Sequence, residues 1–143
     1  MLGRTHLLTA FFLGLILIKF FSFSNPFLFI TILLFASIFP DIDSKKSILG
    51  RHVNFLNTFF KHRGIFHSFF MLILIDLIIW PLGTYIVIAF STGFISHLIL
   101  DSLSKEGLNF LFFGRFKGPI KVGGFYENLF FALIFVLLIL FII

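Results

Sequence analysis

The chain has 143 residues, of which 59% are hydrophobic and 12% are charged, and its mean hydropathy is +1.15. This composition excludes an ordinary soluble domain, because too few polar residues remain to cover a water-facing surface, and it is typical of a helical membrane protein. The formal charge of +5 is explained by basic cytoplasmic loops, so we expect no nucleic-acid partner. Without cysteine, any metal must be held by histidine and carboxylate.

Apolar runs separated by turn signals predict an all-α integral membrane protein, a single transmembrane helical domain over residues 1–143. The turn at Ser24–Pro26 joins two runs, Pro40 ends the second, and Pro81–Gly83 separates two more. We therefore expect a five-span bundle with spans near residues 7–23, 27–39, 64–80, 84–100 and 128–143. A short amphipathic helix near Val53–Phe60 and the segment Ser102–Glu127 should lie at one interface.

The distribution of basic residues predicts the orientation of the bundle in the inner membrane. With five spans, the N-terminus and the loops Ser44–Arg63 and Ser102–Glu127 lie on one side. Every Lys and Arg except Lys19 is on that side, which the positive-inside rule makes cytoplasmic. We expect the N-terminus inside and the C-terminus outside, and the sequence leaves the oligomeric state open.

The ionisable residues that a catalytic or metal site would need lie on the same side. All five histidines and five of the six acids fall there, at or near span ends. Ionisable groups beside hydrocarbon are costly, which makes them a functional-site hypothesis. They are His6, Asp41, Asp43, His52, His62, His67, His97, Asp101, Glu106 and Glu127.

Local spacing allows several of these residues to share a ligand. His97 and Asp101 are four residues apart and therefore neighbours on one helix face. Asp41 and Asp43 would point the same way if the backbone there is extended. Mixed histidine and carboxylate sets bind divalent metal. The alternative is a hydrogen-bonded polar network that ties helix ends together without metal.

The stretch from Lys61 to Ser68 has the highest density of residues that could bind metal or substrate. We expect His62 just before the third span and His67 one turn inside it, so that both approach one point. Arg63 could bind a phosphate in bidentate fashion, or it could be an interfacial anchor. The candidates exceed what one ion needs and suit two bridged ions, with zinc first and manganese, magnesium or iron as alternatives.

Four segments together resemble the YdjM-like family of membrane-bound metal-dependent hydrolases. They are Thr5-His6, Pro40–Asp43, His62–Ser68 and Ser96–Ser102, the last followed by Gly107. Phe66 departs from the family's usual threonine. The resemblance implies a hydrolase whose metal centre contains His6, Asp41, Asp43, His62, His67, His97 and Asp101.

We expect metal-activated water to attack an ester or phosphoester of a phospholipid or other amphiphile at the cytoplasmic leaflet. Asp43 or Asp101 would serve as base and Arg63 would stabilise developing charge. His52 and Glu106 are interpreted as surface residues, and Glu127 as a ligand, a partner of a ligand or a helix N-terminal charge. Two other classes stay open, a metal or ion transporter and a non-enzymatic scaffold stapled by metal.

Two charges lie inside predicted spans, Lys19 and Asp76. Counted from the cytoplasmic ends of their helices, they reach similar depths of about 20 Å. The sequence therefore predicts an ion pair between the first and third spans, away from the chemistry.

Overall fold

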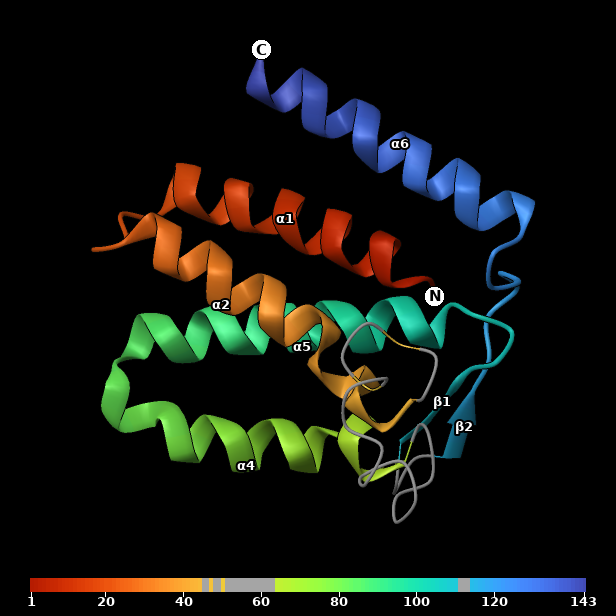
Figure 1. Ribbon diagram of the computed structural model, residues 1–143, viewed down its shortest axis with the longest axis horizontal. Coiled ribbons are helices and arrows are strands. Elements are labelled where there is room, and N and C mark those ends of the chain that lie inside the picture. Colours follow the sequence, from red (N-terminus) through yellow and green to blue (C-terminus); the bar gives the residue numbers. More distant parts are fainter. Residues whose placement is uncertain (45–46, 48–49, 51–63, 111–113) are drawn as a thin grey trace.

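The structure is a computed structural model that describes residues 1–44, 47, 50, 64–110 and 114–143. This part is helical, as predicted, with one small antiparallel β-hairpin inside the segment 102–127 (Figure 1). The elements are α1 (Gly3–Phe20), α2 (Pro26–Ile38), α4 (Phe69–Ile79), α5 (Thr84–Ser102), β1 (Leu108–Phe110), β2 (Gly114–Phe116) and α6 (Phe125–Ile142). The predicted interfacial helix at 53–60 lies outside the described residues.

Within the described ranges, four helices are long and apolar enough to cross a membrane: α1, α2 with its 3₁₀ extension, α5 and α6. Helix α4 is shorter than expected. Its 11 residues and the 3₁₀ turn Trp80–Leu82 rise about 22 Å, less than the roughly 30 Å of a hydrocarbon core. The fifth span near residues 64–80 therefore stays a prediction.

Local sequence explains where the helices begin and end. The Asn25 side chain accepts a hydrogen bond from the N–H of Leu28, and Pro26 occupies the first turn, so α2 begins with a capped end. Pro40 converts the end of α2 into the 3₁₀ helix Phe39–Asp43. Ser68 caps α4, which places His67 before that helix and not one turn inside it as predicted.

The helices pack in the order α6, α1, α2 with α5, and α4 (Figure 1). The closest approach is that of α2 to α5 at Gly93. A Cβ atom on Gly93 would lie 2.2 Å from the carbonyl oxygen of Leu33 and 3.0 Å from the Cβ of Ala36, so only glycine permits this separation. One turn further along both helices, the same approach brings Ser37 to His97.

The predicted ion pair between Lys19 and Asp76 is wrong. Asp76 of α4 accepts a 2.7 Å hydrogen bond from Ser91 of α5, and Lys19 of α1 lies 4.6 Å from the ring centroid of Phe141 in α6. The reason is helix order: α1 and α4 lie on opposite sides of α5 (Figure 1). Equal depth in a membrane does not make two helices neighbours.

Candidate metal centre

Four side chains converge on one side of the bundle, where α2 and α5 end and α4 begins. One nitrogen or carboxylate oxygen from each of them lies within 4.8 Å of all the others. We call this set the four-residue cluster: Asp41, His67, His97 and Asp101. Three of its members are buried, and Asp41 is 18% exposed at its side chain.

Three segments far apart in the sequence supply the cluster. Asp41 lies on the 3₁₀ helix that follows Pro40, and His67 lies on the 3₁₀ helix Ile65–His67. His97 and Asp101 are one turn apart on α5, as their spacing predicts. The core of α2 and α5, which is buried at Ala36 and Phe94, fixes these segments relative to one another.

His97 presents its Nε2 atom to the cluster in one defined tautomer. Its Nδ1 atom lies 2.7 Å from the main-chain carbonyl oxygen of Ser37. A carbonyl oxygen can only accept, so Nδ1 carries the proton and Nε2 keeps its lone pair. This Nε2 lies 3.3 Å from His67 Nε2, 3.7 Å from Asp101 Oδ2 and 3.8 Å from Asp41 Oδ1. Such an arrangement is typical of a ligating imidazole held by a main-chain acceptor.

His67 lies between two carboxylates. Its Nε2 atom is 3.5 Å from Asp41 Oδ1 and its Nδ1 atom is 3.4 Å from Asp43 Oδ2. Burial by itself lowers the pKa of His67, but the contacts with Asp41 and Asp43 outweigh burial and raise this pKa to about 9. The two carboxylates therefore favour the protonated form of the imidazole when no metal is bound.

Asp41 and Asp43 do not point the same way, contrary to the expectation for an extended backbone. The residues form a 3₁₀ helix, in which positions two apart face different directions. As a result, Asp41 enters the cluster, and Asp43 contacts the nitrogen of His67 that faces away from it. Asp43 is thus placed to orient the ring of His67.

His6 lies beside the cluster, on the other oxygen of Asp101. Its ring stacks on that of His97, with centroids 4.0 Å apart, and its Nε2 atom is 3.4 Å from Asp101 Oδ1. The amino nitrogen of Met1 also contacts this oxygen. Asp101 Oδ2 faces His67 and His97. His6 is fully buried, and among the described residues neither of its ring nitrogens has a hydrogen-bond partner.

Glu127 is bound to the start of α1 and not to the cluster. Its Oε1 atom accepts hydrogen bonds from the N–H of Leu2, at 2.6 Å, and from the Thr5 hydroxyl, at 2.9 Å. Its Oε2 atom accepts one from the N–H of Gly123 at 2.7 Å. Helix α1 has no side-chain cap of its own and no acid in its first turn, so Glu127 supplies both from α6. The sequence did not indicate the role of Thr5 or of the Ser37 carbonyl.

His62, Arg63 and His52 fall outside the described residues. Glu106 is exposed, as interpreted from the sequence. Ser68 caps α4.

The cluster fits a tetrahedral divalent ion. Ligands 2.0–2.1 Å from zinc are about 3.3 Å from one another in a tetrahedron. The distances involving His67 Nε2 and His97 Nε2 run from 3.3 to 3.8 Å, close to that value. A divalent cation at this point would also be stabilised by the two carboxylates, of which Asp101 is buried and Asp41 is partly exposed. The residues present therefore make a possible metal site.

Comparison with known proteins identifies the family of the chain. No curated protein and no solved structure matches the chain. The model of the YdjM inner membrane protein family matches residues 1–143, which is the whole chain. This match confirms the family resemblance of the four sequence segments, and the apolar helices are those of a membrane protein. The chain therefore belongs to the YdjM inner membrane protein family.

Proposed function

We propose that the protein is a membrane-embedded metal-dependent hydrolase that cleaves an ester or phosphoester bond of a phospholipid or similar amphiphile. The observation that carries this proposal is the four-residue cluster, a buried set of two imidazoles and two carboxylates in an otherwise apolar bundle. Ionisable groups in such surroundings are expensive to bury and are retained where they do chemistry.

A divalent ion, with zinc first and manganese, magnesium or iron as alternatives, would supply a water molecule of lowered pKa and polarise the scissile bond. His97 offers a lone pair at Nε2, and Asp43 holds His67 in the ligating orientation. Asp101 faces His67 and His97 with one oxygen and His6 with the other. Should two ions be bound, His6 and Asp101 would hold the second, at the oxygen that the Met1 amino group also contacts.

Of the two carboxylates expected to act as base, Asp101 belongs to the four-residue cluster and would serve either as a ligand or as the base, since an oxygen bound to metal cannot take up a proton. Asp43 contacts His67 and would act through that imidazole. We retain Arg63 as the residue that binds the anionic group of the substrate, since the sequence places it four residues before His67.

The cluster lies on the side where basic residues gather, so we place it at the cytoplasmic leaflet with the N-terminus inside and the C-terminus outside. Transport of ions would need acids along a path through the bundle. Among the described helices, Asp76 is the acid in mid-helix, and it is hydrogen-bonded to Ser91. This pairing favours hydrolysis over transport.

Metal analysis of the purified full chain tests the proposal, followed by a screen of lipid hydrolysis with and without chelator. We expect bound zinc or a related ion, and hydrolysis of a phospholipid that chelator abolishes and added metal restores. His67→Ala should lose both metal and activity while the protein remains in the membrane. Stoichiometric metal without hydrolysis of any amphiphile would instead support the scaffold, and absence of bound metal would overturn the proposal.

A further inference from the structure

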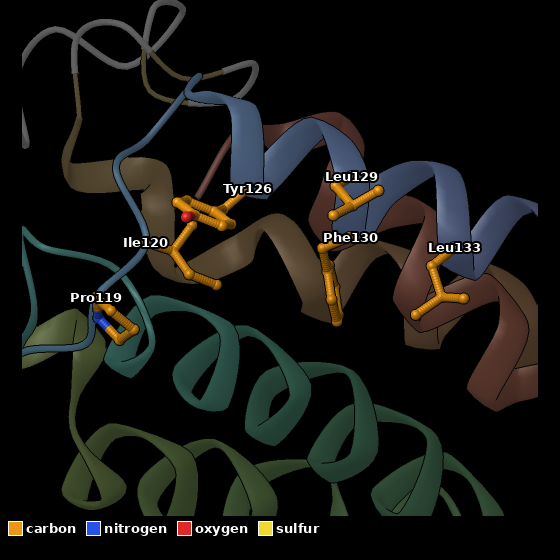
Figure 2. A pocket seen from close by; sticks show the side chains of 6 residues that line it. All are labelled: Pro119, Ile120, Tyr126, Leu129, Phe130 and Leu133. Atoms are coloured by element: carbon orange, nitrogen blue, oxygen red, sulfur yellow. The ribbon is translucent and has the colours of Figure 1, made fainter.

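A second site lies at the start of α6. Figure 2 shows a pocket there, with a volume of about 450 Å³. Its lining is apolar apart from one hydroxyl group and consists of Pro119, Ile120, Tyr126, Leu129, Phe130 and Leu133. Leu129 and Leu133 are 56% and 55% exposed, so the pocket opens on the outer surface of the bundle.

The pocket exists because α6 is held by one face only. Glu127 and Phe141 direct that face toward α1. Phe130 and Leu133 project from α6 toward the side on which α5 lies, and both line the pocket (Figure 2). From Tyr126 to Leu133 the lining extends about 10 Å along the helix axis. An elongated apolar recess of this kind suits a hydrocarbon chain.

Three lysines are close in the chain or by main-chain contact to Pro119 and Ile120, at one end of the pocket. The carbonyl oxygen of Ile120 accepts a 2.7 Å hydrogen bond from the N–H of Lys105, which brings that lysine to the pocket lining. Lys121 follows Ile120 directly, Lys117 lies two residues before Pro119, and all three lysines are exposed. A lysine near a membrane surface attracts anionic lipid by about 1 kcal/mol. Charge therefore complements an anionic headgroup at this end.

The end of the pocket at Ile120 adjoins the metal centre. The N–H of Ile120 donates a 3.2 Å hydrogen bond to the carbonyl oxygen of Leu103, two residues beyond Asp101. Glu127, next to Tyr126, accepts from Leu2, whose neighbour Met1 contacts Asp101. The beginning of the pocket and the ligating end of α5 are thus parts of one hydrogen-bonded unit.

We infer that this pocket binds the acyl chain of an anionic membrane lipid, whose headgroup lies among Lys105, Lys117 and Lys121. The inference rests on the proposed function in one respect, namely that the bound lipid is the substrate. Binding itself requires neither metal nor turnover. In this inference, α6 binds the acyl chain and the lysines of the segment before α6 bind the anionic headgroup.

Photolabelling tests the site without hydrolysis. The full-length His67→Ala protein is placed in phosphatidylcholine vesicles with a trace of phosphatidylglycerol or phosphatidylcholine that carries a diazirine on the acyl chain. At residues 129–133, labelling by the anionic probe should exceed that by the neutral probe at least about fivefold, the preference that one lysine alone supplies. At Ile139, which is exposed and about 130° around the helix from the pocket, the two probes should label equally.

Three variants separate the contributions to binding. Leu133→Trp fills the pocket and should abolish the preference, whereas Ile139→Trp, the matched control, should leave it intact. Lys121→Gln should reduce the preference and leave labelling by the neutral probe unchanged. Equal ratios at the pocket and at Ile139, or a Leu133→Trp variant that labels normally, would overturn the site.

Kinetics of the protein with intact His67 separate this inference from the proposed hydrolysis. We expect Leu133→Trp to raise KM for an anionic lipid and to leave kcat nearly unchanged. Hydrolysis with an unchanged KM would overturn the assignment of the pocket to the substrate and leave the proposed function standing. Selective labelling in a protein that hydrolyses no lipid would overturn the proposed function and support the site as a lipid-binding one.

Discussion

The hydroxyl of Thr5 donates a 2.9 Å hydrogen bond to the carboxylate of Glu127, 122 residues later in the chain. This contact ties the first turn of α1 to the first turn of α6, next to His6. It is buried, and the same carboxylate oxygen also accepts from the N–H of Leu2. Helix α6, one of the two outer helices of the bundle, is therefore fastened at the level of the four-residue cluster.

Glu127→Ala should destabilise the protein without removing the metal. The substitution leaves three donors without their acceptor, and each unsatisfied buried group costs about 1–3 kcal/mol. We expect a lower Tm in detergent and metal content close to that of the unaltered protein. The measurements are thermal unfolding and elemental analysis, with His67→Ala as the control that loses metal. Loss of metal from Glu127→Ala to the same extent would make Glu127 a ligand.

The number of ions should depend on His6. If Asp101 is shared between two ions, His6→Ala removes the histidine of one ion and leaves the four-residue cluster whole. We expect two metal ions per chain to become one, measured by elemental analysis of purified protein. His97→Ala should remove both, because its imidazole belongs to the cluster and stacks on His6. A stoichiometry that His6→Ala does not alter would indicate a single ion.

Metal affinity should rise with pH. The contacts with Asp41 and Asp43 raise the pKa of His67 to about 9, so below that pH the metal must displace a proton. One displaced proton makes the association constant rise about tenfold per pH unit up to about pH 9 and level off above it. Calorimetry in buffers of different ionisation enthalpy measures both the constant and the proton released. An affinity that is flat between pH 6.5 and 8.5 would contradict this account.

Gly93→Ala should weaken both the fold and the metal site. The new Cβ would meet a main-chain oxygen of α2, which cannot turn aside, so the two helices must separate. Overpacking of this kind costs about 1–3 kcal/mol. We expect a lower Tm and a lower metal affinity, because separation moves the Ser37 carbonyl away from His97.

Gly14→Ala is the matched control for that substitution. A Cβ atom there would lie 2.5 Å from the Cδ1 atom of Ile30, the far end of a flexible side chain that can move. This variant should keep both its Tm and its metal affinity. Equal effects of the two substitutions would show that the spacing of α2 and α5 does not govern the site.

Much of the site could be predicted, because the sequence shows which residues lie at the ends of helices and which helix ends lie on the same side of the bundle. His97 and Asp101 share a helix face through their spacing, and the alternation of spans brings Asp41 and His67 to the same end of the bundle. Three features of the site could not be predicted in this way. The direction of Asp43 depends on a 3₁₀ turn after Pro40, the partner of Asp76 depends on helix order, and the bond to the Ser37 carbonyl carries no side-chain signal.

The sequence predicts where helices occur in the fold, but it does not predict their lengths. Apolar runs predict where helices occur, but Ser68 begins α4 several residues later than the apolar run at Gly64 suggests. The short β1–β2 hairpin lies in a Gly-rich aromatic segment, where the alternation of apolar and polar residues in Leu108–Phe110 is too short to predict a strand. Its pairing depends on contacts with the end of α5, such as that between Leu103 and Ile120.

The acceptor for His97 has an evolutionary consequence, since it belongs to the main chain. Every amino acid at position 37 presents the same main-chain oxygen, so loss of the Ser37 hydroxyl leaves the acceptor of His97 in place. Ser37 is fully buried, however, so a larger side chain there would displace α2 and the acceptor with it. We therefore expect only small residues at position 37, as at position 93, to preserve the proton position on this imidazole.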